Sequence, residues 1–455
     1  MRKRNIHGAM LGFAFGVLWL VACTLSGLSP KIEQTFPSPI LTSTSIQTLI
    51  PATSTMGSKM SSQVLTSTPT PTPEFTPSPV DTSVSIPTPS HSLHLIAYFY
   101  GQNENNLVSA IPGDLLTDII YAFVDISADG KCASMDPGVD KKSYSALQQL
   151  NQLHPSLRIL FSIGGYSHSA RFSDVAASEN GRIQFVQSCI QYLRLNGLDG
   201  IDIDWEFPVS GGMDGNKHRL EDSQNFTVLL AEFRKQLDLQ GKMDGKSYLL
   251  SIAAPAGPSE FRYFELSQIC PMVDWITVMA YDFYTGESKI THFNAPLFAV
   301  SSDPGSMTYN GDSAVKAYLA KGIPSDEIVL GVPFYGRAWK GVTENRNGLF
   351  QQNIGPFDDP QVPAGTWGEG GEIEYRAIKQ YYLGSWPRFW QNEAQVPWLY
   401  NPQEQIMLTF DDPESLAAKA DYVRTKQLGG ISIWQISGDD EEHSLLRALA
   451  KHLWS

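Results

Sequence analysis

Eight short apolar segments recur between residues 95 and 434, and they constrain the fold more than any other feature of the chain. Most are continuous runs of aliphatic and aromatic residues, which is typical of strands buried on both faces of a parallel sheet. The segments are 95–100, 119–126, 158–165, 198–206, 248–256, 275–281, 328–334 and 430–434. Helical stretches separate them, and this alternation predicts an α/β protein with the architecture of a (β/α)₈ TIM barrel.

One helical stretch shows the expected pattern clearly. Ile183, Val186, Ile190 and Leu193 form one apolar stripe, and Gly197 follows as a C-terminal cap. A doubly wound open sheet would alternate in the same way, so periodicity alone leaves that fold open. No GxGxxG motif follows the first strand, and a dinucleotide-binding version of the open sheet therefore has no support.

The interval over residues 340–410 is too long and too mixed for a single barrel helix. It contains Gly368-Glu369-Gly370-Gly371, and five of the ten Trp lie between Trp339 and Trp398. We therefore predict a small α+β insertion here, between strands seven and eight of a globular unit that spans residues 91–455.

The N-terminal 22 residues are expected to be a targeting segment. Three basic residues at positions 2–4 precede an uncharged, mostly apolar run over 8–22, which is shorter than the about 20 residues of a membrane span. The run ends in Leu20-Val21-Ala22-Cys23, which resembles the bacterial lipobox. We expect a lipoprotein signal peptide, lipidation of Cys23, and an extracellular protein held at the bacterial cell surface by this anchor. A plain signal peptide with a chance cysteine is the alternative.

Residues 23–90 are expected to form a linker behind the lipidated cysteine. Of the 67 residues over 24–90, 39 are Ser, Thr or Pro and only five are charged. Such a segment cannot bury enough apolar surface to offset its ordering entropy, so we expect it to be disordered. Pro-rich chain extends by about 3.1 Å per residue, which lets the globular unit stand up to roughly 200 Å from Cys23.

Charge and cysteine content exclude several classes of function. The formal charge of −14 argues against binding of nucleic acid, whose phosphates require a basic surface. The four cysteines include no CxxC and no nearby pair of histidines, so a zinc site is not expected. They are also too few for a disulfide framework. Whether Cys132, Cys189 and Cys270 pair is left open.

The most informative segment is Asp199-Gly-Ile-Asp-Ile-Asp-Trp-Glu-Phe-Pro208. Alternate side chains of a strand share a face, so Asp202, Asp204 and Glu206 should point one way. The opposite face, which should pack beneath the helices, comprises Ile201, Ile203, Trp205 and Phe207. We therefore expect the three acids to point into the barrel, with Glu206 at the C-terminal mouth, where barrel enzymes carry their chemistry.

Three carboxyl groups stacked inside a barrel carry a large desolvation cost that stability does not explain. Such close like charges cannot all ionise, so at least one pKa must rise, and a carboxyl group kept protonated near neutral pH suits a general acid. A site for a hard cation or a solvated edge strand would be the alternatives. No further cluster of Asp or Asn completes a cation site nearby, and no metal is expected.

These residues resemble the signature of glycoside hydrolase family 18, the chitinases and their relatives. The DxxDxDxE motif stands as Asp199, Asp202, Asp204 and Glu206. Three further motifs are SxGG at Ser162-Ile163-Gly164-Gly165, MxYD at Met279-Ala280-Tyr281-Asp282, and a late barrel tryptophan at Trp434. The resemblance covers residues 94–455 in order, and segments 396–401 and 410–413 look like the bacterial branch that carries the insertion.

The resemblance implies four catalytic residues and no cofactor. Glu206 would protonate the glycosidic oxygen, and the N-acetyl carbonyl oxygen of the substrate would act as the nucleophile, with retention at the anomeric carbon. Asp204 would orient the acetamide N–H, and Asp202 would share a proton with Asp204. Tyr281 would hold the acetamide carbonyl in place.

The resemblance also implies residues that line the substrate groove, with core packing as the alternative for several of them, above all for Phe123. They are Tyr98, Phe123, Gly165, Tyr166, Met279, Asp282, Arg337 and Trp434. Two positions depart from the family pattern: Tyr166 stands where Trp is frequent, and Tyr284-Thr285-Gly286-Glu287 replaces a Gly-Ala-Trp step. A stacking tryptophan on the leaving-group side is therefore expected to be missing.

The implied function is that of a retaining, endo-type chitinase that cleaves β-1,4 bonds between N-acetylglucosamine residues. Its expected partners are chitin or N-acetylglucosamine oligosaccharides, with membrane contact through the lipid anchor only, and we expect a monomer. The same machinery could act on N-glycan cores or bacterial wall glycans. A non-catalytic chitin-binding lectin is disfavoured because Glu206, the acid that such lectins typically lose, is present.

Overall fold

The computed structural model of the protein describes residues 93–101, 108–362 and 370–455. The predictions for the signal peptide, Cys23 and the linker lie outside these residues. Within the described residues, no helix combines the length and the apolar character that a membrane span requires.

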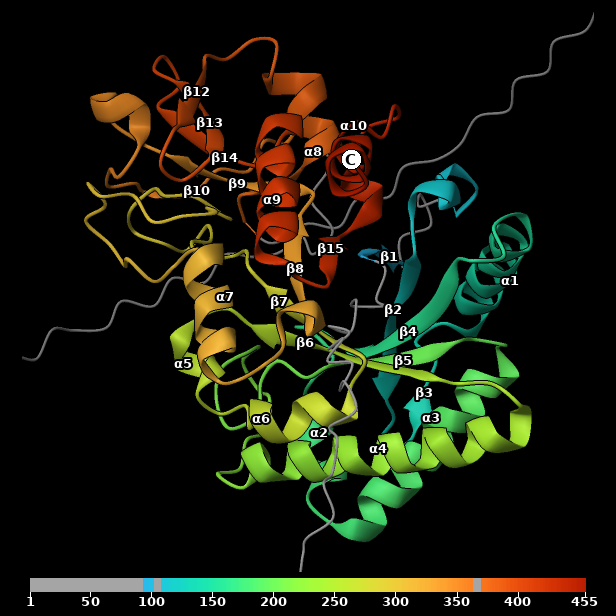
Figure 1. Ribbon diagram of the computed structural model, residues 1–455. Coiled ribbons are helices and arrows are strands. Elements are labelled where there is room, and N and C mark those ends of the chain that lie inside the picture. Colours follow the sequence, from blue (N-terminus) through green and yellow to red (C-terminus); the bar gives the residue numbers. More distant parts are fainter. Residues whose placement is uncertain (1–92, 102–107, 363–369) are drawn as a thin grey trace, which may run out of the picture. The chain divides into compact units, whose positions relative to one another are not determined.

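Eight parallel strands close into a barrel, which confirms the predicted fold (Figure 1). Each strand pairs with the next one around the barrel, and β1 pairs with both β2 and the last strand, β15. The strands are β1 (His94–Tyr100), β2 (Asp118–Ile126), β4 (Arg158–Gly164), β5 (Gly200–Asp204), β6 (Leu249–Pro255), β7 (Trp275–Met279), β8 (Ile328–Pro333) and β15 (Gly430–Trp434).

Helices cover the outside of this barrel. The longer ones are α1 (Pro137–Leu153), α3 (Glu179–Leu195), α4 (Asp222–Asp244), α7 (Gly311–Ala320), α9 (Pro413–Lys426) and α10 (Ser444–Leu453). The short ones are α2 (Phe172–Ala176), α5 (Pro258–Phe261) and α6 (Leu266–Ile269). Single 3₁₀ turns complete the connections: η1 (Val108–Ala110), η2 (Gly113–Leu115), η3 (Cys270–Met272), η4 (Ser325–Glu327), η5 (Asn345–Gly348) and η7 (Ile436–Gly438).

The ends of α3 show how local sequence sets a helix. The side chain of Ser178 caps its start by accepting a hydrogen bond from the backbone N–H of Gly181 (3.1 Å). Gly197 adopts a left-handed conformation with φ +64° beyond the other end. The N–H groups of Gly197 and Leu198 then donate to the carbonyl oxygens of Arg194 and Leu193, which is a Schellman motif. The predicted cap at Gly197 is therefore present.

Residues alternate between the two faces of the barrel strands. On β1, Leu95 and Phe99 belong to the large apolar core between strands and helices, whereas Ile96 and Tyr98 belong to a separate cluster inside the barrel. The inner cluster also contains Trp434. A barrel filled in this way is a packed core, so a site can open only at its end.

The predicted insertion between the seventh and eighth barrel strands is present as an antiparallel sheet. Its elements are β9 (Tyr335–Lys340), β10 (Gly355–Pro356), β11 (Glu372–Glu374), α8 (Tyr375–Ala377), the π-helical turn η6 (Ile378–Tyr382), β12 (Arg388–Gln391), β13 (Val396–Asn401) and β14 (Ile406–Thr409). The sheet begins at Tyr335, before residue 340, because β9 follows β8 after a single residue. Figure 1 shows this sheet beside the barrel, where α9 contacts β13.

One disulfide bond ties a barrel connection to the outer layer of helices. Cys132, on the two-residue strand β3 (Cys132–Ala133) that pairs with the end of β2, is bonded to Cys189 of α3. Cys270 is a buried free thiol. The structure thus answers the pairing question that the sequence leaves open.

Candidate active site

The acidic residues of β5 point into the barrel, and the apolar residues between them point outward. Ile201, Ile203 and Trp205 are buried in the core beneath the helices, where the Trp205 ring stacks on Phe172 at a centroid distance of 5.2 Å. Asp202 and Asp204 are buried as well, with 0% and 4% of their surfaces exposed. Both acids therefore sit in the low-dielectric interior.

Asp202 is held by three hydroxyl groups. Tyr98 and Ser162 donate to Oδ2 at 2.9 and 2.7 Å, and Ser251 donates to Oδ1 at 2.7 Å. The strand register explains the two serines, because Ser162 of β4 and Ser251 of β6 stand directly beside Asp202. Burial raises the pKa of Asp202, and these hydrogen bonds oppose the rise without cancelling it.

Asp204 has a different environment. Its Oδ1 is buried and has no hydrogen-bond partner among the described residues. Burial raises the pKa of Asp204 well above its usual value, and the nearby charges of Glu206 and Asp202 raise it further. Asp204 is therefore a carboxyl group with spare hydrogen-bonding capacity, directed at the space above β5.

Glu206 lies just beyond the end of β5, which stops at Asp204 rather than at residue 206 as predicted. Its backbone is held from both sides: the N–H donates to Ser169 Oγ (2.9 Å), and Asn216 Nδ2 donates to the carbonyl oxygen (2.9 Å). Because the chain leaves the strand here, Phe207 lines the cleft at the barrel mouth and not only the outer core, which corrects its predicted position.

Two glycines, the last residue of β4 and the one after it, allow the backbone of β5 and the ring of Phe123 to approach closely. A Cβ on Gly164, which has φ +105°, would lie 2.3 Å from the carbonyl oxygen of Asp204. A Cβ on Gly165, with φ +76°, would lie 2.5 Å from the ring of Phe123. Both positions therefore require glycine, and this is the physical basis of the Ser162-Ile163-Gly164-Gly165 motif.

The end of β7 brings a phenol and a paired carboxylate to the mouth. Burial raises the pKa of Tyr281 well above its usual value, with further contributions from Asp204 and Glu206, so its hydroxyl stays protonated and can donate. Asp282 accepts hydrogen bonds from Tyr335 (2.7 Å) and from Arg337 (2.6 and 2.9 Å). Both oxygens of Asp282 are thus engaged by the insertion strand β9.

An aromatic surface closes the barrel interior beneath the mouth. The ring of Trp434 stacks on Phe123 with a centroid distance of 5.5 Å and an interplanar angle of 20°. Tyr98 contacts the same indole at 5.4 Å. Only 6% of Trp434 is exposed, so its ring presents one restricted flat surface, which suits stacking against a sugar ring.

A cleft of about 540 Å³ opens above these residues. Most of the predicted site residues line it: Phe123, Tyr166, Asp204, Glu206, Met279, Tyr281, Asp282, Arg337 and Trp434. Tyr98, Gly165 and Asp202 do not line the cleft. Tyr98 and Asp202 lie below the cleft within the barrel, and Gly165 lies against the ring of Phe123. These three residues can therefore influence the cleft only by positioning the residues that line it.

Several lining residues were not predicted from sequence. They come from the loops after β6 and β7 and from the insertion, and they include Ser259, Glu260, Phe283, Tyr309 and Gly370. No local pattern marks them, because loop sequence does not indicate which loops meet at the mouth. Ser162 and Ser251 could have been found, since each stands in an apolar strand where a polar residue needs a partner.

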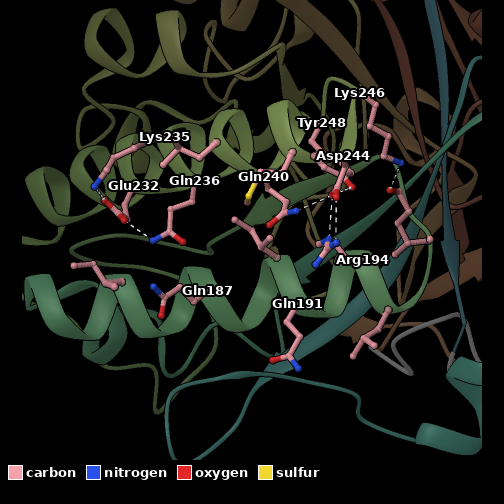
Figure 2. Close-up of a pocket in the computed structure, with 17 residues that line it drawn as sticks. Gln187, Gln191, Arg194, Glu232, Lys235, Gln236, Gln240, Asp244, Lys246 and Tyr248 are labelled. Carbon is pink, nitrogen blue, oxygen red and sulfur yellow. Dashed lines mark hydrogen bonds and ion pairs between the residues drawn. The ribbon is translucent and has the colours of Figure 1, made fainter.

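A larger groove, of about 1010 Å³, lies between α3 and α4 on the outside of the barrel (Figure 2). Its polar side chains bind one another: Arg194 pairs with Asp244, Glu232 with Lys235, and Gln240 with Asp244. This groove is a seam between two helices whose charges are already satisfied. The chemistry therefore belongs to the cleft at the barrel mouth.

No group of three or more His, Cys, Asp or Glu side chains in the described part of the chain is arranged to hold a metal ion. The carboxyl groups of Asp202 and Asp282 are instead bound by hydroxyl and guanidinium donors.

Comparison with known proteins agrees with this geometry. The model of the glycosyl hydrolases family 18 matches residues 94–439. Chitinase B of Serratia marcescens is 33% identical over 391 residues, which covers 74% of this chain and 76% of that protein. Chitinase A1 of Niallia circulans is 41% identical over 300 residues, or 64% of this chain, but the match spans only 42% of that longer protein.

Solved structures of similar proteins share this fold. Chitinase ChiA74 from Bacillus thuringiensis superposes with a TM-score of 0.74 at 31% identity, covering 80% of this chain and 70% of that one. The barrel, the acids of β5 and the match over residues 94–439 lead to one conclusion: the chain belongs to family 18 of the glycosyl hydrolases.

Proposed function

We propose that the protein is a retaining, endo-type chitinase that hydrolyses β-1,4 bonds between N-acetylglucosamine residues with the help of the substrate's own acetamide group. The chitinases similar to this chain support the substrate class. The cleft supports the chemistry, since it places an acid, a phenol donor and a flat indole around one space.

The observation that carries the proposal is the buried Oδ1 of Asp204, which has no hydrogen-bond partner among the described residues. An unsatisfied buried acceptor costs free energy, so its persistence suits a site that a ligand completes. An acetamide N–H of a bound sugar would supply the missing donor. Tyr281, protonated because its pKa is raised, would donate to the carbonyl oxygen of the same acetamide.

In the proposed reaction, Glu206 protonates the glycosidic oxygen as the C–O bond breaks, and the acetamide carbonyl oxygen bonds to the anomeric carbon. The resulting oxazolinium ion carries a positive charge that Asp204 stabilises. Glu206 then takes a proton from water, which attacks the anomeric carbon and restores the acetamide. Asp282 is poorly suited to act as a nucleophile, because Tyr335 and Arg337 engage both of its oxygens.

The proposal includes an extracellular location at the cell surface through a lipid on Cys23. The disulfide between Cys132 and Cys189 supports an oxidising compartment, since such bonds persist mainly outside the cytosol.

The test uses the purified protein and its Glu206→Gln variant on a fully acetylated chitin hexasaccharide. Glutamine keeps the size of the side chain but has no proton to donate, so turnover should fall by about 10²-fold or more. The product should form first as the β-anomer, which NMR resolves, and internal bonds should be cut. Near-parental turnover in the variant, or an inverted anomer, would refute the mechanism.

A second measurement addresses the acetamide itself. On partly deacetylated chitosan, every new reducing end should be N-acetylated, because only an acetylated sugar carries the nucleophile. Mass spectrometry of the product ends decides this. A substantial share of glucosamine at new reducing ends would rule out catalysis by the substrate's acetamide group, even if chitin were cleaved.

A further inference from the structure

The cleft at the barrel mouth carries more negative charge than the proposed reaction uses. Five acidic residues line it, namely Asp204, Glu206, Glu260, Asp282 and Glu287, against one basic residue, Arg337. Arg337 is committed to Asp282 at 2.6 Å. Burial raises the pKa of Asp204, and Arg337 neutralises Asp282, so the negative charge that remains beside the proposed acid Glu206 is that of Glu260 and Glu287.

Glu260 and Glu287 account for the excess. Glu260 lies on α5, after β6, and its Oε2 accepts a hydrogen bond from Ser259 (2.7 Å), which leaves its charge in place. Glu287 lies in the loop after β7 and is exposed. Neither carboxylate forms an ion pair with a Lys, Arg or His of the described residues. Neither has a role in the proposed proton transfers.

A second feature of the same cleft points to a ligand. The Oδ1 of Asp204, a residue with 4% of its surface exposed, lies in the lining of this cleft without a hydrogen-bond partner among the described residues. The aromatic side chains of Tyr166, Phe283 and Trp434 line the same space, as expected for a site that binds sugar rings. Glu260 and Glu287 line this same cleft.

We propose that the cleft selects chitin chains that carry free amino groups, and that Glu260 and Glu287 bind the ammonium groups of glucosamine units next to the acetylated sugar that reacts. This inference rests on the proposed function, because the reacting sugar still needs its acetamide. It adds that the neighbouring sugars are preferentially deacetylated. Fully acetylated chitin presents only neutral groups there and gains nothing from the two carboxylates.

The size of the effect follows from exposure. A two- to fivefold change in kcat/KM corresponds to about 0.4–1 kcal/mol in total, or about 0.2–0.5 kcal/mol for each of the two carboxylates, which lies within the range of about 0.2–1 kcal/mol for exposed ion pairs. Salt should reduce this preference, since the Debye length falls from about 14 Å at 0.05 M to about 4 Å at 0.5 M ionic strength.

The experiment compares two hexasaccharide substrates, one fully acetylated and one partly deacetylated, at a pH at which the amino groups are protonated. The readout is the ratio of kcat/KM on the mixed substrate to kcat/KM on the acetylated one, so that effects common to both cancel. We expect Glu260→Gln/Glu287→Gln to lower this ratio about two- to fivefold. The parental ratio should also fall as salt rises.

Two controls keep the result specific. Glu404→Gln removes an exposed carboxylate in the turn after β13, outside the cleft lining, and should leave the ratio unchanged. Chemical re-acetylation of the mixed substrate should abolish the difference between the parent and the double variant. If the double variant unfolds, the exposed Glu287→Gln alone should still lower the ratio.

The outcomes separate this inference from the proposed function. A parental protein that cleaves neither substrate would refute the proposed function. Cleavage of both substrates with the same ratio in the parent and the double variant would overturn the role of Glu260 and Glu287 alone. A lower ratio in the double variant that salt does not affect would also overturn it, because the recognition would not be electrostatic.

Discussion

Two neighbouring aspartates on β5 show how the same residue type takes different roles two positions apart. Asp202 accepts hydrogen bonds from three hydroxyls, so its charge is compensated within the protein. Asp204 lacks such support, and its pKa rises well above the usual value because of burial and the nearby acids. A proton shared by the pair is therefore expected to reside mainly on Asp204 until a substrate supplies a donor.

Replacement of Asp204 should reveal the cost of this arrangement. The unfolded chain ionises Asp204 at a pKa of about 3.9, whereas the folded protein holds the proton to higher pH. Ionisation therefore destabilises the fold as the pH rises above about 4, and no such cost exists below it. Asp204→Asn should raise the melting temperature by a few degrees at pH 7 and have little effect near pH 3, as measured by calorimetry.

Asp202→Asn serves as the matched control. Its amide nitrogen would meet hydroxyl donors where the carboxylate accepts them, so this variant should be less stable than Asp204→Asn at pH 7. A melting temperature of Asp204→Asn below that of the parent at pH 7 would contradict the account. Hydrolysis of chitin by Asp204→Asn should fall even as stability rises.

At the scale of elements, the strands on either side of β5 position the side chains that bind Asp202. Ser162 and Ser251 reach Asp202 because β4, β5 and β6 are in register at these residues. A slip by one residue would turn both hydroxyls to the outer face. Gly164 adds a steric condition, since only a glycine leaves room for the backbone of β5 at this point.

The disulfide bond between Cys132 and Cys189 connects two further elements, β3 and α3. The disulfide closes a loop of 57 residues between Cys132 and Cys189. A Cys132→Ser/Cys189→Ser variant should lose about 2–4 kcal/mol of unfolding free energy, mainly through greater freedom of the unfolded chain. Denaturant unfolding measures this loss. Cleavage of the hexasaccharide at low temperature should persist, because neither cysteine lines the cleft.

Reduction provides the control. A thiol reductant should destabilise the parent to the level of the double variant and leave the double variant unchanged. Cys270→Ser, which replaces a free thiol, should respond to the reductant as the parent does. Equal effects of the reductant on the parent and the double variant would exclude the bond as the cause.

At the scale of the whole molecule, the barrel has two distinct ends. His94 begins β1, so it lies at the end of the barrel opposite the cleft, which opens above the last residues of the strands. The described chain therefore enters the barrel at the end that does not carry the candidate site.

The proposed anchor can be tested in a bacterial host that processes lipoproteins. Cys23→Ser removes the sulfur that would carry the lipid, so incorporation of labelled palmitate should be lost and the protein should leave the membrane fraction. Immunoblotting of fractions and autoradiography measure both effects. Cys270→Ser should keep the label. Equal labelling of Cys23→Ser and the parent would exclude lipidation at Cys23.

The sequence alone was sufficient to predict the strands of the barrel and the face on which the acids of β5 lie. Continuous apolar runs reflect burial of each strand, and the alternation of Asp202 and Asp204 with isoleucines reflects the two faces of a strand. Both are local properties, which neighbouring residues determine. The eight predicted segments accordingly overlap all eight barrel strands.

Only the tertiary structure determined which residues, distant in the sequence, contact these elements. Tyr98 reaches Asp202 from 104 residues away, Cys132 bonds to Cys189, and Glu260 and Glu287 both line the cleft. Each contact depends on the closure of the barrel, on strand register and on the path of its loops. These are set by the packing of the entire core, and no short window of sequence contains that information.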